Sequence, residues 1–469
     1  MVKPNNSPSN NYLIPFILIT SLFFMWGIAN NLNGILIPHL RKALQLSNMQ
    51  STFVDTAVYM AYFLMAIPAG IILKKFGYKK GIIMGLLIFA AGALLFLPAA
   101  NMRAYEVFLL GLFILGCGLT LLETAANPYA TRLGEPHSAT ARLNLAQSFN
   151  GLAVFVAPII GTLFILSGKE YSKEQLQAMP EVDKIAYLAG EADSVKMPYL
   201  ILGGFLILLA VVFYFMKLPE LSEGTPTEEE KNEQNTYGTS RISDFGFPIS
   251  DLRFVDNATN RKSEIGNPKS EGGIFDTLKY SHVKWAVIAQ FFYVGAQVCV
   301  TSFFIRMAMS GGGVDEKTAG FYLSAYGLLF MVGRFVGSAL VSYIAPAKLL
   351  SIYSLICIVL SGIAIFTAGQ FVVFALGGLG FFMSIMFPTI FALGIVGLSE
   401  GTPTKKEDTK SASSLIVMAI VGGAIFPVIM GRIIDSTGDN IQIGYIVPFV
   451  CFFVVWYFGW KGHEIIHHS

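Results

Sequence analysis

One acidic residue lies inside a long apolar run. The segment from Gly116 to Pro128 reads GCGLTLLETAANP, and its only charged residue is Glu123. Helical spacing puts Thr120 and Asn127 on the same face, at i−3 and i+4. A carboxylate near the middle of a bilayer costs about 2.5–3.5 kcal/mol on insertion scales, so it must face protein or a water-filled space. An acid at the centre of a polar face therefore indicates a site or route for polar cargo, as in a transporter.

Other polar residues recur at helical spacing inside apolar runs, and they supply amides, phenols and an indole. Amides and carboxylates can hydrogen-bond to vicinal hydroxyls, and aromatic faces can cover the C–H side of a sugar ring. Arg334 lies near a helix end, so no cluster of basic residues favours an anion at this depth. Any single amide could instead hold two helices together. We expect the substrate site to include Glu123, Asn127, Gln147, Asn150, Asn30, Asn33, Gln290, Tyr293 and Gln297.

The composition is that of a membrane protein. Hydrophobic residues make up 54% of the chain and charged residues only 13%, against about 25% charged residues in soluble domains. A net charge of +2 gives no reason to expect a nucleic-acid partner. The histidines His463, His467 and His468 lie at the extreme C-terminus, and we expect no metal, no cofactor and no enzymatic activity.

Twelve apolar runs are long enough to span a bilayer, near 20 residues each. They predict an all-α membrane protein with two six-helix halves, 1–217 and 283–469. The polar stretch 218–282 is predicted to be a linker on the cytoplasmic side. The first run is too long for the core of a signal peptide, so we expect it to be retained. The runs lie near 12–38, 52–74, 80–99, 104–131, 142–167, 197–217, 283–309, 318–344, 348–368, 371–398, 411–435 and 443–461.

Basic residues in the short loops set the expected orientation. The second and third runs are joined by a loop that contains Lys74, Lys75, Lys79 and Lys80, whereas the next connection offers only Arg103. The side richer in lysine and arginine is normally cytoplasmic. With an even number of spans, both termini and the linker are then cytoplasmic. The same loop resembles the glycine-and-basic loop signature of the major facilitator superfamily, but it has Lys74 at the acidic position.

Five segments carry a more specific resemblance. They are NNLNGILIP (30–38), LETAANP (122–128), RLNLAQSFN (142–150), AQFFYVGAQ (289–297) and FPTIF (387–391). The chain is similar here to the fucose–galactose–glucose:proton symporter family of the major facilitator superfamily. The resemblance implies the major facilitator fold and import of L-fucose or a related neutral monosaccharide with protons, by alternating access. It also implies a monomer that spans the lipid bilayer of the bacterial inner membrane many times.

The resemblance also assigns expected roles. In the family, a glutamate of the fourth helix binds substrate and takes part in proton coupling, and Glu123 occupies that position. Gln147 and Asn150 match polar cavity positions of the fifth helix. A proton-coupling aspartate known on the first helix is matched here by Gly34, and our hypothesis is that Asp55 takes over its role from the second helix.

Several alternatives stay open at this stage. Asp55 could bind sodium instead of a proton, or transport could be facilitative, with glucose, galactose or an amino sugar as substrate. A receptor that binds sugar without moving it is a different class of function with the same polar residues. The sequence does not determine the sugar, the coupling ion or the oligomeric state.

Overall fold

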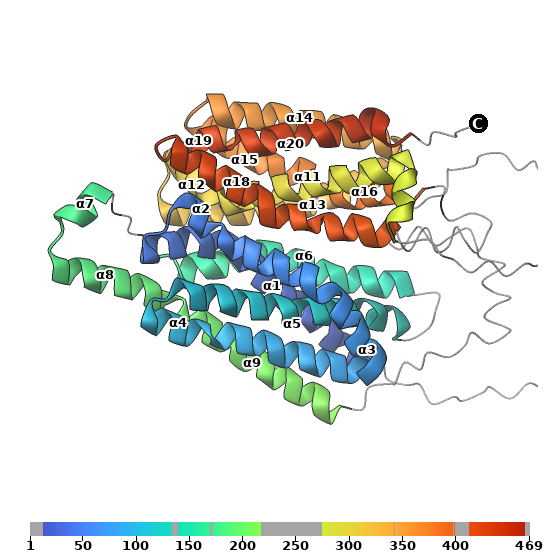
Figure 1. The fold of residues 1–469 in the computed structure, drawn as a ribbon, viewed down its shortest axis with the longest axis horizontal. Coiled ribbons are helices and arrows are strands. Elements are labelled where there is room, and N and C mark those ends of the chain that lie inside the picture. Colours follow the sequence, from blue (N-terminus) through green and yellow to red (C-terminus); the bar gives the residue numbers. More distant parts are fainter. Residues whose placement is uncertain are drawn as a thin grey trace, which may run out of the picture. The chain divides into compact units, whose positions relative to one another are not determined.

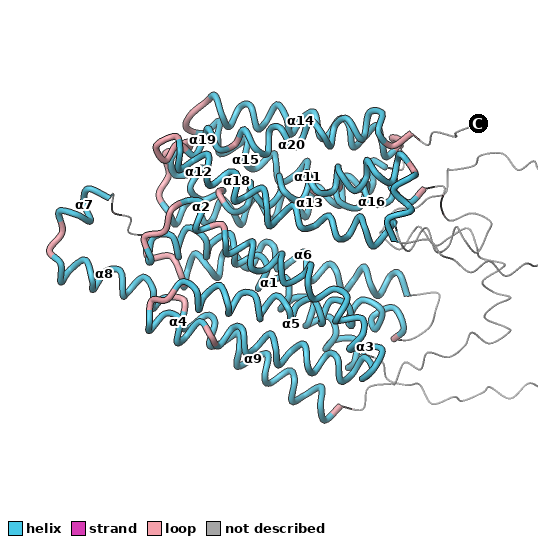
Figure 2. Tube along the Cα trace, viewed as in Figure 1, coloured by secondary structure: helices cyan, strands magenta, loops and turns pink. Residues whose placement is uncertain are grey.

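The structure is a computed structural model that describes residues 13–133, 139–168, 171, 173–216, 274–341, 343–396, 398 and 412–464. These residues form helices, turns and loops, with no strand among them (Figures 1 and 2). Twelve of the described helical stretches are long and apolar enough to cross a membrane. The prediction of an all-α membrane protein with twelve spans is therefore confirmed.

The chain divides into two compact units. Unit 1 comprises Met1–Thr225 together with Val314–Leu328, and unit 2 comprises Pro226–Gly313 together with Leu329–Ser469. The helices of unit 1 are α1 (Leu13–Leu44), α2 (Asn48–Ser51), α3 (Phe53–Leu94), α4 (Phe96–Met102), α5 (Tyr105–Arg132), α6 (Ala139–Phe164), α7 (Lys173–Ala178), α8 (Glu181–Ser194), α9 (Lys196–Phe215) and the first part of α13 (Glu316–Val341).

Unit 2 holds the second part of α13 and the helices that flank it. They are η3 (Ile274–Lys279), α11 (Ser281–Ser302), α12 (Phe304–Ser310), α14 (Pro346–Phe366), α15 (Gln370–Met383), α16 (Met386–Ile395), η4 (Ala419–Val421), α18 (Gly422–Ser436), α19 (Ile441–Gly444), α20 (Ile446–Tyr457) and η5 (Phe458–Gly462). Of the predicted linker 218–282, the part up to residue 273 lies outside the described residues. Its last residues form η3 and the start of α11.

The two units differ from the predicted halves at α13. Residues 314–328 fall in the second half of the sequence but belong to unit 1. The cause is close packing against α6: a Cβ added at Gly320 would lie 2.2 Å from Thr162 Oγ1, and one added at Gly327 would lie 2.5 Å from the Val154 carbonyl oxygen. Helix α13 is thus shared between the units.

Helix α3 contains two membrane spans joined at a sharp bend. The backbone at Gly77 has φ +78°, a left-handed conformation inside an otherwise helical run. Glycine adopts this conformation at little cost because it has no Cβ. The two spans are Asn48–Leu73 and Lys75–Met102, so the second and third predicted runs are confirmed as separate crossings.

Glycines bring α5 close to both parts of α3. A Cβ added at Gly116 would lie 2.8 Å from the Ala61 Cβ, and one added at Gly118 would lie 2.4 Å from the Phe89 backbone nitrogen. Small residues permit such close helix approach in membranes. This packing fixes α5 against α3 less than two turns before Glu123.

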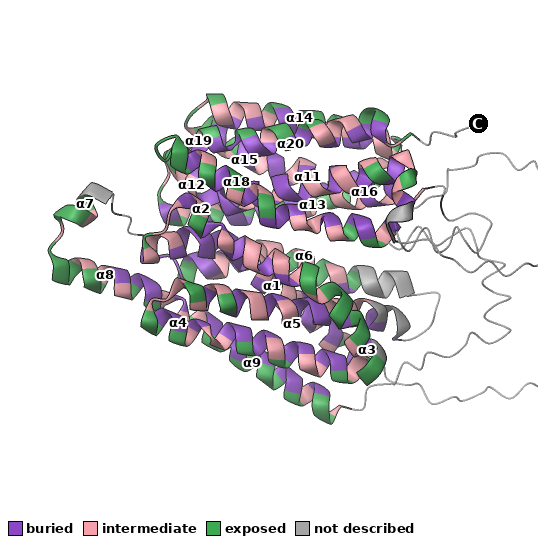
Figure 3. Ribbon diagram, in the orientation of Figure 1, coloured by how far each residue is buried: buried purple, intermediate pink, exposed green. Residues whose placement is uncertain are grey.

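Many large apolar side chains are exposed, and exposed residues recur along most of the long helices (Figure 3). Ile67 is 71% exposed and Phe205 is 39% exposed, although both lie within predicted membrane spans. Exposed apolar faces suit contact with lipid rather than with water. The exposure pattern therefore agrees with a membrane setting.

Two spans of unit 2 are interrupted. The tenth span breaks between α15 and α16, at Ser384 and Ile385, just before Pro388. The eleventh contains the 3-10 turn η4 directly before Gly422. Such breaks free backbone groups and permit bending.

Candidate functional site

Glu123 lies on α5, half-buried, where polar side chains from two other helices approach it. The hydroxyl of Tyr62, on the first part of α3, is within hydrogen-bonding reach of the carboxyl. The Tyr62 oxygen in turn accepts a hydrogen bond of 3.3 Å from Asn30 Nδ2, on α1. A phenol has one proton to donate. With Asn30 as its donor, Tyr62 is free to donate that proton to Glu123.

Trp26 lies one turn before Asn30 on α1. Its indole N–H is directed at the same Tyr62 hydroxyl, but without a hydrogen bond of normal geometry. The ring packs against Phe23 with 5.8 Å between the ring centroids. Trp26 thus adds an aromatic surface beside the Tyr62 hydroxyl.

A second polar pair lies one turn further along α5. Gln147 Nε2, on α6, donates a hydrogen bond of 3.1 Å to Asn127 Oδ1. The bond uses one donor and one acceptor, and it leaves Asn127 Nδ2 and Gln147 Oε1 to bond to a ligand. Both side chains are half-buried. We use the name Glu123 cluster for Glu123, Tyr62, Asn30, Asn127 and Gln147.

The other two predicted residues of α1 and α6 lie beside this cluster. Asn150 Nδ2 donates 3.2 Å to the Phe23 carbonyl oxygen and so ties α6 to α1. Asn33 is only 8% exposed. Asn150 therefore joins two helices in this structure, and Asn33 is a buried residue of α1.

Asp55 lies elsewhere on α3. It is 3% exposed, in the first turn of the helix, and its neighbours include the phenols of Tyr59 and Tyr105. Seven residues separate it from Tyr62 along the helix, a rise of about 10 Å. Gly34, where the family's first-helix acid is expected, is buried on α1.

The three predicted residues of α11 belong to unit 2. Gln290 is fully buried, and within the described residues neither its amide nitrogen nor its amide oxygen has a hydrogen-bond partner. Tyr293 is also fully buried, and its hydroxyl donates 2.9 Å to the Met383 carbonyl oxygen. Gln297 is half-buried. An amide without partners is costly inside a protein, which marks Gln290 as a residue that needs a ligand or a rearrangement.

The described part of the chain contains no group of three or more His, Cys, Asp or Glu residues that could hold a metal ion. Of the terminal histidines, His463 is described, and its ring nitrogen Nδ1 lies 3.1 Å from the Phe458 carbonyl oxygen. His467 and His468 lie outside the described residues.

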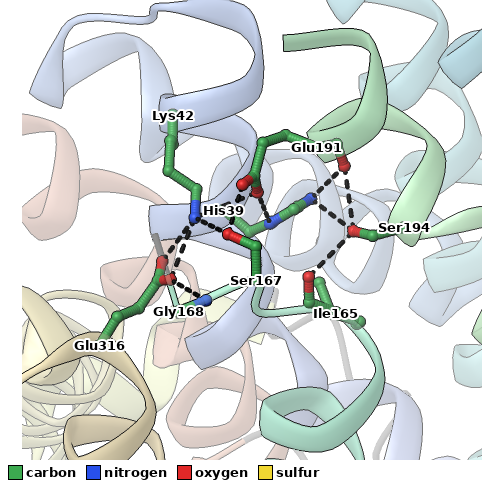
Figure 4. A network of polar contacts seen from close by, with 8 residues as sticks. All are labelled: His39, Lys42, Ile165, Ser167, Gly168, Glu191, Ser194 and Glu316. Atoms are coloured by element: carbon green, nitrogen blue, oxygen red, sulfur yellow. Dashed lines mark hydrogen bonds and ion pairs between the residues drawn. The ribbon is translucent and has the colours of Figure 1, made fainter. Parts of the chain in front are cut away.

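A second polar network in unit 1 was not predicted (Figure 4). Lys42, near the end of α1, lies 3.1 Å from Glu191 Oε2 on α8 and 2.9 Å from Glu316 Oε1 at the start of α13. Both carboxylates are nearly buried. We use the name Lys42 network for His39, Lys42, Ser167, Glu191, Ser194 and Glu316. The sequence gives little indication of this network, because Lys42, Glu191 and Glu316 lie at the ends of separate apolar runs.

Twelve apolar helices in the described part of the chain, and an acid among neutral amides and a phenol, define a multi-pass membrane protein with an internal polar site. The model of the Major Facilitator Superfamily matches residues 17–402. The chain belongs to this superfamily.

Named relatives cover almost the whole chain. The chain is 39% identical over 461 residues to the L-fucose-proton symporter of Escherichia coli strain K12, covering 97% of this chain and 95% of the relative. It is 34% identical over 470 residues to a glucose/galactose transporter of Brucella abortus biovar 1, with 98% of each chain covered.

Solved structures give the same picture. The crystal structure of a major facilitator superfamily transporter, FucP, in the outward conformation matches with a TM-score of 0.61 and 38% identity, over 97% of this chain and 99% of that one. A bacterial homologue of the lysosomal transporter Spinster reaches a TM-score of 0.70 over 98% of both chains at only 13% identity, which shows the fold alone.

Proposed function

We propose that this protein is a proton-coupled sugar symporter that imports L-fucose or a related neutral monosaccharide by alternating access. The observation that carries the proposal is the Glu123 cluster, in which one acid has only neutral polar partners. A cation partner would hold the acid permanently ionised, and none is among these residues. The names of the relatives, an L-fucose-proton symporter and a glucose/galactose transporter, support the same function.

Sugar recognition would use hydrogen bonds from both polar pairs. A Glu123 carboxylate can accept from a sugar hydroxyl, Asn127 Nδ2 can donate to one, and Gln147 Oε1 can accept from another. Trp26 offers an aromatic face for the C–H side of the ring. Because no arginine or lysine belongs to the cluster, a neutral polyol suits it better than an anionic ligand.

The proton would bind to Glu123 itself. An ionised carboxyl in apolar surroundings disfavours closure of the site around it, because a buried unpaired charge is costly. Protonation removes the charge, so the occupied site can close and reorient. The Tyr62 hydroxyl would stabilise the ionised form between cycles, because it donates to the carboxylate.

Asp55 is proposed as the second acid of the coupling mechanism. Its support is that it is a nearly buried carboxyl on α3, two turns from the tyrosine that contacts Glu123. We expect Asp55→Asn to retain exchange of labelled for unlabelled sugar, because exchange needs no net proton movement. Its uptake against a concentration gradient should fall at least about tenfold, which corresponds to about 1.4 kcal/mol. Undiminished concentrative uptake by Asp55→Asn would remove Asp55 from the mechanism, even if Glu123 stays essential.

Glucose or galactose is the second candidate for the substrate. The relative from Brucella, called a glucose/galactose transporter, matches 98% of this chain. Sodium coupling through Asp55 is the matching alternative for the ion. A panel of labelled monosaccharides, with L-fucose first, would be tested for uptake into vesicles under separately imposed proton and sodium gradients. Counterflow of labelled sugar would exclude a receptor that binds without transport.

We also propose that the protein works as a monomer in the bacterial inner membrane with both termini in the cytoplasm. The lysines at positions 75, 79 and 80 support this orientation, because cytoplasmic loops are enriched in basic residues. Under this orientation the end of α1 and the start of α13 face the periplasm. Cysteine labelling with a membrane-impermeant reagent at Asn101, an exposed residue near the end of α4, and at Lys75 would test it: only the former should react in intact cells.

A further inference from the structure

The tautomer of His39 is set by its surroundings. His39 is fully buried on α1, and its Nε2 lies 2.8 Å from the Glu191 carbonyl oxygen. A carbonyl oxygen can only accept, so Nε2 must carry a hydrogen and donate it. The Ser194 hydroxyl is 3.1 Å from the same nitrogen, and it donates to the Ile165 carbonyl oxygen at 2.9 Å (Figure 4).

The other ring nitrogen then faces a carboxylate with no hydrogen between them. His39 Nδ1 lies 3.5 Å from Glu191 Oε2, and the two side chains are 0% and 2% exposed. Within the described residues Nδ1 has no hydrogen-bond partner, and Oε2 has Lys42 Nζ at 3.1 Å as its ion-pair partner. In a neutral imidazole with hydrogen on Nε2, Nδ1 presents a lone pair. Two lone pairs facing one another in a buried place repel, unless a proton lies between them.

The charge balance of the network leads to the same conclusion. Glu191 and Glu316 carry two negative charges when ionised, and Lys42, which lies close to both, carries one positive charge. Without another proton the network has a net charge of −1, and a buried net charge is costly. One added proton makes the network neutral. The other charged side chains near these helix ends are Arg41, Arg103, Asp193, Lys196, Asp315 and Lys317, whereas Glu181, Asp183 and Lys184 lie at the other end of α8 and Arg334 lies in the second part of α13.

Several of these flanking groups already have partners of their own. Asp193 pairs with Lys196, and Asp315 accepts hydrogen bonds from Thr318. Arg103 donates to the Ala43 carbonyl oxygen at 3.3 Å. The His39–Glu191 pair is therefore the place in the Lys42 network where an added proton would both fill a missing hydrogen bond and balance the charge.

We propose that the Lys42 network is a second proton-binding site, in which one proton is held between His39 Nδ1 and Glu191 Oε2. The bound proton forms the hydrogen bond that these two atoms lack. Nε2 keeps its hydrogen and its bond to the Glu191 carbonyl oxygen throughout. The site is separate from Glu123, and it does not depend on the identity of the sugar.

The proton also determines how Lys42 is shared. When the proton is bound, the His39–Glu191 pair is neutral as a unit, and Lys42 is available to Glu316. Glu316 is then held by Lys42 at 2.9 Å and by the Gly168 backbone N–H at 3.1 Å. When the proton leaves, Lys42 is the cation shared by two ionised carboxylates, Glu191 and Glu316. Deprotonation thus weakens the contact that holds the first turn of α13 to the end of α1.

The test is nitrogen NMR of the full-length protein in lipid nanodiscs, with ¹⁵N-labelled histidine. The six histidines are assigned by single substitutions, His39 by His39→Gln. The spectra are collected between about pH 5 and pH 8, the range in which imidazoles normally titrate. The matched variants are Glu191→Gln, which puts an amide N–H opposite Nδ1, and Glu181→Gln, at an exposed residue of the same helix α8.

We expect Nε2 of His39 to stay protonated at every pH. Nδ1 should give a protonated or strongly hydrogen-bonded signal at low pH that is lost as the pH rises, in the wild type and in Glu181→Gln. In Glu191→Gln the Nδ1 signal should be that of a hydrogen-bonded acceptor that does not change with pH. A free, unprotonated Nδ1 at every pH in the wild type would overturn the proposal, and so would an unchanged titration in Glu191→Gln. The titration of the wild type tests the proposal even if a variant does not fold. None of these measurements depends on transport.

Discussion

The two polar networks of unit 1 are built in opposite ways. The Glu123 cluster has one acid, no basic partner and side chains that are half-buried. The Lys42 network has two acids, a lysine and a histidine, and its ion pairs are nearly or fully buried. Both come from helix ends or helix faces that the fold brings together from distant parts of the chain.

The charged and neutral side chains of each network determine what it can do. Amides and a phenol around a single acid can exchange hydrogen bonds with a neutral ligand, and the acid can change its charge when a proton binds. Charges that compensate one another gain little by releasing a partner, because one left alone in a buried place is costly. The first arrangement therefore suits binding and release of a ligand, and the second suits a contact that holds helices in place and whose strength depends on the proton between His39 and Glu191.

The largest expected effect comes from removing the lysine. Lys42→Met leaves Glu191 and Glu316 without their shared cation, and breaking a buried ion pair in this way costs about 3–5 kcal/mol. We expect a clear fall in the midpoint of thermal unfolding of the detergent-solubilised protein. Lys196→Met is the matched control, because Lys196 pairs with Asp193 at a place where the side chains are 27% and 57% exposed. An exposed pair contributes about 0–1 kcal/mol. Similar falls in the unfolding midpoint of both variants would therefore contradict the claim that the buried Lys42 pairs stabilise the protein more than the exposed Lys196–Asp193 pair.

The next effect is on sugar binding at Glu123. Glu123→Gln keeps the shape of the side chain but loses the charge, and hydrogen bonds to charged groups contribute about 1.5–3 kcal/mol. We expect the affinity for the transported sugar to fall by roughly 10- to 150-fold, measured by isothermal titration calorimetry or by inhibition of uptake. Glu106→Gln, at an exposed residue in the first turn of the same helix, should bind as the wild type does. Equal affinity of both variants would remove Glu123 from the sugar site.

The smallest effect is expected at Tyr62. Tyr62→Phe removes the hydroxyl between Asn30 and Glu123, and a single hydrogen bond contributes about 0.5–1.5 kcal/mol. We expect the KM for sugar uptake to rise by roughly 2- to 12-fold, with little change in stability. Tyr199→Phe serves as the control, because Tyr199 is buried in a ring stack with Phe96, 3.8 Å between centroids. A larger change in the control than in Tyr62→Phe would show that the hydroxyl has no part in the site.

The sequence was enough to predict the twelve spans, and it singles out Glu123 as the acid to place in a candidate site. Apolar length identifies a membrane helix, and an acid inside such a helix stands out by its cost. The sequence also names Asn127 and Gln147 as candidate site residues, but their hydrogen bond depends on the packing of α6 against α5. The role of Tyr62 was harder to predict. The sequence places it on the second apolar run, but it does not show which side chains its hydroxyl contacts.

The Lys42 network was out of reach for a physical reason. Its residues come from the end of α1, from α8 and from the start of α13, and only packing brings them together. The first predicted run ends near residue 38, but α1 continues to Leu44 and so carries His39 and Lys42. Helix α8 lies in the region 168–196, where apolar length gives no prediction. The assignment of residues 314–328 to unit 1 likewise depends on glycine contacts with α6 that no local pattern reveals.

The central claim is that sugar and proton move together through Glu123. The most direct test is purified protein in liposomes, with L-fucose added outside and the external pH recorded together with the entry of labelled sugar. For the wild type we predict a rise in external pH that follows sugar entry, and for Glu123→Gln no sugar-dependent pH change. Sugar entry without proton movement in the wild type would contradict the account, and so would a wild-type pH change in Glu123→Gln.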